Sequence, residues 1–161
     1  MGSGPASDPR GAGQASPLTA FLDTNVLIRH LTGDPPNQAA LATATLSGPG
    51  PLLLADLILA ECVYVLESFY EVEPKRVAEL MRAALALPSI AVIDAALLVR
   101  AIEVYETARL DFTEAYLVAA AEATGVGEIV SFDRSIDRIE TRQAPRTLTH
   151  PVRRRCRSVE T

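Results

Sequence analysis

The length and composition of the chain predict one folded domain. It has 161 residues, of which 48% are hydrophobic and 22% charged, as in an ordinary well-packed globular domain. No apolar run approaches the roughly 18 residues that a membrane-spanning helix requires, and no signal peptide is evident, so we expect a cytoplasmic protein. Cys62 and Cys156 suggest neither a metal site nor a disulfide framework.

Charge is distributed unevenly along the chain. The net charge is −5, but residues 21–145 hold nine Lys or Arg and eighteen Asp or Glu, whereas residues 146–161 hold five Arg and one Glu. An acidic body does not attract nucleic acid by charge alone. A polyanionic substrate would therefore need a metal ion or local arginines to offset the repulsion.

Both ends are predicted to lie outside the folded domain, which we expect at residues 18–150. Residues 1–17 contain ten Gly, Pro or Ser residues and no hydrophobic periodicity, which predicts a flexible leader. Residues 151–161 form a basic tail that we expect to be disordered and to attract phosphate weakly.

Between the two ends, hydrophobic patterning predicts short strands that alternate with helices. Apolar runs of β character predict strands at residues 19–22, 52–55, 90–93 and 128–131, and residues 147–148 could add an edge strand. Helical patterns occupy residues 25–31, the stretch after Pro36 to about residue 46, 57–70, 74–87, 95–107 and 112–124. This alternation predicts an α/β fold with a mainly parallel sheet and right-handed crossovers.

An aspartate ends or closely follows each predicted strand. The carboxyl ends of parallel strands lie along one edge of a sheet, so Asp23, Asp56, Asp94 and Asp133 are expected on the same side, where open α/β sheets bind ligands. Each is also a candidate helix N-cap, whose side chain accepts free backbone N–H groups. Capping is a sufficient explanation for Asp56 and Asp94.

Glu61 is harder to explain by local structure. It is the only charged residue in residues 57–66, in a helix with apolar residues on nearly every face that is predicted to be deeply buried. A buried carboxylate without a partner is costly. Three alternatives remain open: an ion pair with an arginine such as Arg29, a narrow exposed stripe shared with Ser68, or a bound metal ion.

Asp111 and Glu114 are spaced like a capping box, with Asp111 as the N-cap and Glu114 at the third helical position. Such a carboxylate can also face a metal ion if the helix start points into a site. Together with Asp23, Glu61 and Asp133, these acids would repel one another unless a cation lay between them. Carboxylate oxygens suit Mg²⁺ or Mn²⁺, and the lack of His and Cys ligands argues against zinc.

Four motifs in this order carry a resemblance to a known family: Phe21-Leu22-Asp23-Thr24-Asn25-Val26-Leu27-Ile28, Leu59-Ala60-Glu61-Cys62-Val63-Tyr64-Val65-Leu66, Leu110-Asp111-Phe112-Thr113-Glu114-Ala115 and Val130-Ser131-Phe132-Asp133-Arg134. They resemble the motifs of the PIN domain, and within that family those of the toxin subunits of VapBC-type toxin–antitoxin pairs. The resemblance covers roughly residues 20–150.

Position by position, Asp23 and Glu61 match the family's first two acids and Asp133 its fourth, with Ser131 at the supporting hydroxyl position. The third acid departs from the family pattern. An aspartate usually precedes the alanine that Ala115 matches, whereas this chain has Glu114, which is one methylene longer.

The resemblance implies a three-layer α/β/α domain with a four- or five-stranded sheet, whose first strand lies between the second and the fourth. It also implies a Mg²⁺- or Mn²⁺-dependent endoribonuclease that is inhibited by a separate antitoxin and forms a homodimer.

In that mechanism four acids would be catalytic: Asp23, Glu61, Glu114 and Asp133. Asp23, Glu114 and Asp133 would hold the metal, while Glu61 would bind metal or orient the attacking water. Support would come from Thr24, Asn25, Asp111 and Ser131.

Two other readings of the sequence remain. A strand that ends in Asp could belong to an aspartyl-phosphate phosphatase, but Asn25 replaces the second aspartate of the haloacid-dehalogenase pattern and no clear phosphate-binding lysine follows a strand. Alternatively, the chain is a catalytically weakened PIN-like module that binds RNA or protein, with Glu114 as the sign of lost activity.

Overall fold

The computed structural model describes residues 20–126 and 128–130. In this part of the chain three short strands and six helices follow one another: β1 (Ala20–Phe21), α1 (Thr24–Thr32), α2 (Pro36–Leu46), β2 (Leu52–Leu53), α3 (Asp56–Ser68), α4 (Pro74–Leu85), β3 (Ile90–Ala91), α5 (Ala95–Ala108) and α6 (Phe112–Thr124). The predicted helices are all present, with ends within about two residues of those expected, as is usual for helix boundaries. The strands are shorter than predicted.

The strands form a small parallel sheet in the order β1-β2-β3. Its backbone pairing extends slightly beyond the strands, because the N–H of Leu22 donates to the carbonyl of Leu53 at 2.9 Å and that of Leu54 to Ala91 at 2.8 Å. The expected pairing of the first two strands is confirmed. Residues 128–130 of the predicted fourth strand, the other proposed neighbour of β1, are described but are not part of the described three-stranded sheet. Ser131 and the possible edge strand at residues 147–148 lie outside the described residues.

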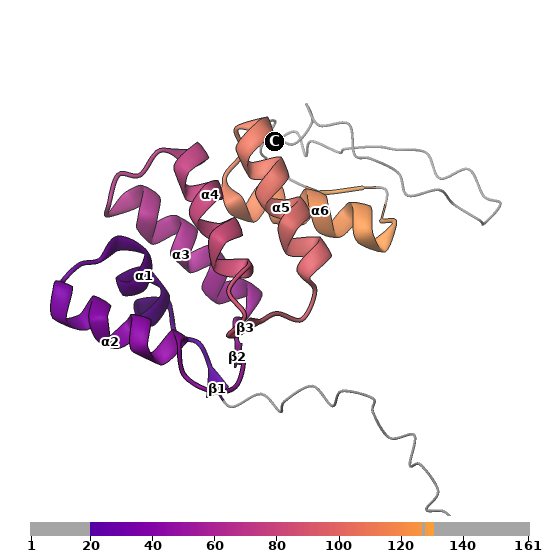
Figure 1. Cartoon of the computed structure of the whole chain (residues 1–161). Coiled ribbons are helices and arrows are strands. Elements are labelled where there is room, and N and C mark those ends of the chain that lie inside the picture. Colours follow the sequence, from indigo (N-terminus) through magenta and orange to yellow (C-terminus); the bar gives the residue numbers. More distant parts are fainter. Residues whose placement is uncertain (1–19, 127, 131–161) are drawn as a thin grey trace, which may run out of the picture.

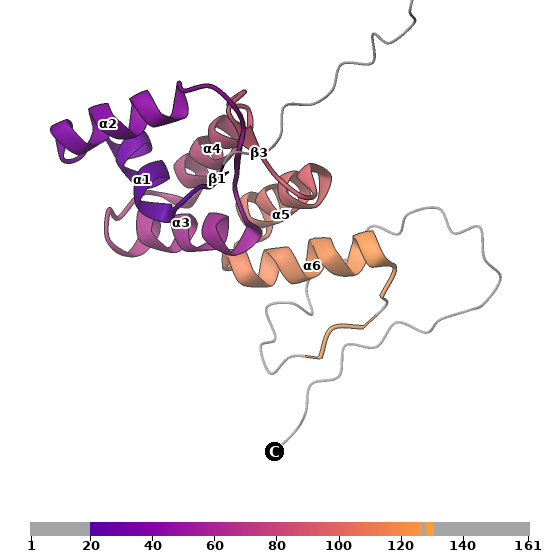
Figure 2. The same cartoon turned by 90° about the horizontal axis from the view of Figure 1, so that it is seen from below.

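Helices lie on both sides of the strands, as Figures 1 and 2 show: α1 and α2 lie together on one side, and α5 and α6 on the other. The arrangement is a helix-rich α/β fold consistent with a PIN-like three-layer α/β/α domain. Residues of the helices and of the sheet region together form the hydrophobic core. Its fully buried side chains include Leu27, Leu54, Leu59, Val77, Leu98 and Val118. No helix among the described residues is both long and apolar enough to cross a membrane.

Helix α3 is not deeply buried on every side, so that prediction was wrong. It buries Leu59, Cys62, Val63 and Leu66, but Leu57 is 77% exposed and Tyr64 68% exposed. Glu61 and Ser68 are exposed as well. These four exposed residues recur at helical spacing and form one stripe, hereafter the α3 stripe. The sequence of α3 is largely apolar, yet one side of the helix faces solvent. The apolar pattern did not indicate this side, because leucine and tyrosine can also lie at a surface.

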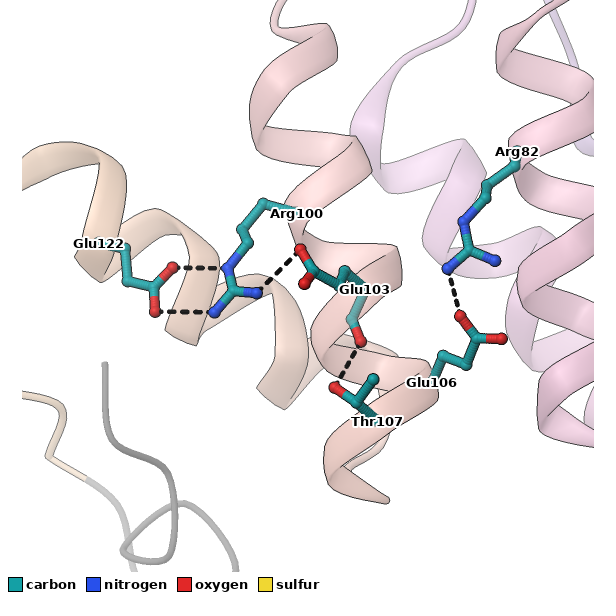
Figure 3. A network of polar contacts seen from close by, with 6 residues as sticks. All are labelled: Arg82, Arg100, Glu103, Glu106, Thr107 and Glu122. Carbon is teal, nitrogen blue, oxygen red and sulfur yellow. Dashed lines mark hydrogen bonds and ion pairs between the residues drawn. The ribbon is translucent and has the colours of Figure 1, made fainter. Parts of the chain in front are cut away.

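Ion pairs connect the three later helices (Figure 3). Arg100 on α5 binds Glu122 on α6 through two hydrogen bonds, of 2.7 and 3.1 Å, and Glu103 on its own helix at 3.0 Å. Arg82 on α4 pairs with Glu106 on α5, and this hydrogen bond holds the pKa of Glu106 below its usual value. The pair between Arg100 and Glu122 fixes α6, which carries Glu114, against α5.

Candidate metal centre

Asp23 lies where β1 ends and α1 begins, at the carboxyl edge of the sheet. Its extended backbone, with φ −88° and ψ 149°, lets the carboxylate turn back over the helix start. Oδ1 accepts the backbone N–H of Asn25 at 2.9 Å. Asp23 is therefore the N-cap of α1, as one of the two interpretations predicts. The side chain is exposed, so capping leaves it accessible to a ligand.

Thr24 connects this turn to helix α3. Its hydroxyl donates to Oε2 of Glu61 at 2.6 Å, and Thr24 is only 6% exposed. Glu61 itself is exposed, so the prediction of a buried carboxylate was wrong. It lies on an exposed stripe with Ser68, as one of the alternatives held, and its binding of a metal ion stays a prediction. Arg29 is not its partner: its guanidinium donates to the carbonyl of Asp34 and to the hydroxyl of Tyr70.

The charges of Asp23 and Glu61 both affect the pKa of the Cys62 thiol. Its thiol is completely buried. Burial, followed by the negative charges of Glu61 and then Asp23, raises the pKa of Cys62 to about 12. Two acids from distant parts of the sequence therefore act on one buried group, which is consistent with a shared site. The thiol itself remains protonated at neutral pH and is a poor candidate nucleophile.

The third acid lies in the first turn of α6. Oδ1 of Asp111 accepts the backbone N–H of Glu114 at 2.8 Å, so the prediction that Asp111 caps this helix is confirmed. Glu114 is half-buried. It carries the negative charge that is favourable near the positive end of a helix dipole.

Asp56 differs from the prediction. The N-cap of α3 is Ala55, and Asp56 occupies the first helical position. Its Oδ2 accepts a hydrogen bond from the hydroxyl of Tyr116 on α6 at 2.6 Å. The cap was mispredicted because a tertiary partner engages the carboxylate. Asp94, by contrast, caps α5 as predicted and accepts the N–H of Leu97 at 2.9 Å.

Sequence reasoning missed Tyr116. The hydrogen bond to Asp56, then burial and the charges of Asp56 and Asp94, raise the pKa of the Tyr116 hydroxyl to about 12. A signal was present: Tyr116 carries the only polar side-chain atom in the otherwise apolar run of residues 115–121. A tyrosine in such a helix usually finds a partner for its hydroxyl.

The described residues bring Asp23, Thr24 and Glu61 together but contain no group of three potential ligands that could hold a metal ion. The expected fourth acid, Asp133, and the supporting Ser131 lie outside the described residues. The donors that are present are carboxylate oxygens, which fit Mg²⁺ or Mn²⁺ in chemical type.

Comparison with known families agrees with this architecture. The model of the PIN domain matches residues 20–141, so the chain belongs to the PIN-domain family. PIN domains form a superfamily of nucleases that generally use divalent metal ions, which supports a hydrolase whose substrate class is nucleic acid. None of the curated proteins compared with the chain matches it.

Proposed function

We propose that the protein is a Mg²⁺- or Mn²⁺-dependent endoribonuclease that hydrolyses phosphodiester bonds of RNA. The observation that carries this proposal is the convergence of the family's first two acids. Asp23 lies at the end of β1, and Glu61 on α3 accepts a hydrogen bond of 2.6 Å from the hydroxyl of Thr24, the residue that follows Asp23. An acidic chain of net charge −5 also needs a cation where it meets a polyanion.

In this proposal Asp23, Glu114 and Asp133 would hold the metal, and Glu61 would bind metal or orient the attacking water. A bound divalent ion would neutralise the scissile phosphate and favour deprotonation of water. Thr24 holds the carboxylate of Glu61 by its hydrogen bond, and the backbone N–H of Asn25 orients the carboxylate of Asp23. Asp111 fixes the first turn of α6, and Ser131 supports the fourth acid. These protein groups would set the geometry of the reaction before RNA binds.

Replacing Asp23 tests the assignment. We expect Asp23→Asn to abolish Mn²⁺-dependent RNA cleavage and to weaken Mn²⁺ binding in calorimetry, while circular dichroism remains unchanged because asparagine caps helices as well as aspartate does. Asp94→Asn is the matched control, since Asp94 also follows a strand and caps a helix but is outside the proposed acid set. Equal cleavage by the wild type and Asp23→Asn would contradict the proposal.

A second function follows from Glu114, which replaces the family's usual aspartate. The longer side chain supports a catalytically weakened PIN-like module that binds RNA or a protein. The same calorimetry separates the two functions. Absence of Mn²⁺ binding by the wild type at millimolar concentration, together with retained RNA binding, would favour the module.

We further propose that the protein is the toxin of a type II toxin–antitoxin pair, acts in the cytoplasm and forms a homodimer. The resemblance of the motifs to VapBC toxins suggests this role. The α3 stripe supports it, because Leu57 and Tyr64 expose apolar surface on either side of Glu61. A partner segment lying there would cover both apolar side chains and block access to the acid.

A further inference from the structure

Two tyrosine–carboxylate hydrogen bonds hold the two ends of helix α3. Tyr116 on α6 donates to Asp56, the first residue of α3, at 2.6 Å. Tyr105 on α5 donates to Glu67, near the end of α3, at 2.7 Å. Both bonds are partly buried, where a hydrogen bond to a charged group is stronger than at a surface.

The bond from Tyr116 lies between the two helices that carry candidate acids. Glu61 is on α3, and Glu114 precedes Tyr116 by two residues on α6. In Figure 2 the start of α6 lies next to α3, whereas the rest of the helix runs away from it. The extensive packing of α6 is against α5, and its packing against α3 is slight. This hydrogen bond joins a side chain of α3 directly to one of α6.

Asp56 accepts this hydrogen bond from Tyr116 and does not cap its own helix, although the sequence predicted that it would. It leaves the capping position to Ala55, which provides no side-chain hydrogen bond to the helix start. Oδ1 of Asp56 is buried with no hydrogen-bond partner among the described residues. The carboxylate therefore bears a desolvation cost, and the hydrogen bond that it accepts comes from α6 and not from the backbone of its own helix.

We propose that Tyr116 is a positioning residue for the metal centre: through Asp56 it fixes the first turn of α6, and with it Glu114, relative to Glu61 on α3. This inference rests on the proposed nuclease function, because it assigns Glu114 and Glu61 to one site. Carboxylates that bind the same ion must keep their separation to within a few tenths of an ångström, and slight packing between α3 and α6 does not ensure this.

The test compares two matched substitutions, Tyr116→Phe and Tyr105→Phe. Each removes one hydroxyl that donates to a carboxylate of α3 and keeps the aromatic ring. We expect Tyr116→Phe to weaken Mn²⁺ binding in calorimetry about tenfold, the lower end of the range for groups that support metal ligands. Without metal, it should also speed amide hydrogen exchange in the first turn of α6. Tyr105→Phe should lower the melting temperature but leave Mn²⁺ affinity unchanged.

Substitutions at Asp56 provide the reciprocal measurement. Asp56→Asn retains an oxygen that accepts from Tyr116, so it should bind Mn²⁺ nearly as the wild type does, whereas Asp56→Ala should resemble Tyr116→Phe. Combining Asp56→Ala with Tyr116→Phe should weaken binding no further than either change alone, because both remove the same contact.

The outcomes separate this inference from the proposed function. If the wild type binds Mn²⁺, Asp23→Asn does not, and Tyr116→Phe binds as the wild type does, the positioning role is overturned and the nuclease proposal stands. Equal losses of affinity in Tyr116→Phe and Tyr105→Phe would show general destabilisation and would also overturn it. If the wild type binds no Mn²⁺, the positioning role is overturned together with the metal-dependent function.

Discussion

At the scale of single residues, the hydroxyl of Thr24 connects the turn at Asp23 to Glu61 on α3. Thr24 follows Asp23 directly and is buried, yet its Oγ1 reaches Glu61 on another helix at 2.6 Å. A buried hydroxyl without a partner would be costly, and this one is satisfied by the acid whose orientation the proposed chemistry requires. Thr24 therefore has a structural reason to be a hydroxyl residue, and in the proposed mechanism it has a functional reason as well.

Substitution of Thr24 separates these reasons. Thr24→Val preserves the shape of the side chain but removes the donor to Glu61, and we expect Mn²⁺-dependent cleavage to fall about 10–100-fold, as is usual when a group that orients a metal-site residue is lost. Thr24→Ser keeps the hydroxyl and should cleave nearly normally. Initial rates of cleavage of a fluorescent RNA provide the measurement.

Thr32→Val is the control for this experiment. Thr32 lies on the same helix, and its hydroxyl donates locally to the carbonyl of Ile28 at 2.8 Å, away from the acids. Its loss should leave cleavage unchanged. A rate for Thr24→Val equal to that of Thr32→Val would mean that the bond to Glu61 has no part in the reaction.

At the scale of elements, the helices are held to one another by ion pairs and by hydrogen bonds from tyrosine hydroxyls, as well as by packing in the core. The pair between Arg82 and Glu106 joins α4 to α5, and the pair between Arg100 and Glu122 joins α5 to α6. Local patterns can locate each helix but not these partners. Arg82 and Glu106 are 24 positions apart in the sequence, and Arg100 and Glu122 are 22 positions apart. Each pair meets because its two helices pack together.

The Arg82–Glu106 pair predicts a dependence of stability on pH. The hydrogen bond from Arg82 lowers the pKa of Glu106 below its usual value of 4.5. As the pH falls through this range, the unfolded state binds a proton before the folded state does, so the stabilisation is present above about pH 4.5 and is lost below it.

We therefore expect Glu106→Gln to unfold at lower urea concentration than the wild type at pH 7, and this difference to shrink as the pH falls below 4.5, where Glu106 becomes protonated in the folded protein too. Glu79→Gln is the control, because its pair with Arg76 is a largely exposed contact within α4 and should contribute little at either pH. A difference for Glu106→Gln that is independent of pH would contradict the prediction.

At the scale of the whole molecule, the α3 stripe brings the proposed site and the proposed partner surface together. Leu57 and Tyr64 are 77% and 68% exposed on the same side of α3 as Glu61. Exposed apolar side chains that lie close together, here beside the proposed catalytic acid Glu61, are typical of a surface that a partner covers. This placement allows one protein to both bind and inhibit the nuclease.

Co-expression provides the test of the toxin proposal. A short antitoxin-like protein encoded directly upstream should co-purify with this chain and suppress its RNA cleavage. Leu57→Asp should weaken that complex, because a charge in an apolar contact is costly, while free Leu57→Asp retains cleavage. Leu41→Asp is the control, since Leu41 is similarly exposed, at 69%, but lies on α2. Equal suppression of the wild type and Leu57→Asp would exclude the α3 stripe as the binding surface.

Sequence alone determined the helices, the parallel α/β arrangement, and the caps formed by Asp23, Asp94 and Asp111. These features depend on periodicity and on side chains that bond the backbone within three residues, so they are encoded locally. Asp133, Ser131 and the ends of the chain lie outside the described residues and stay predictions. Only the tertiary structure decided that Glu61 is exposed and bound by Thr24, and that Asp56 binds Tyr116 instead of capping its helix. Those contacts depend on how helices distant in sequence pack, and an apolar pattern does not specify which of its residues will face solvent or which hydroxyl will meet a given carboxylate.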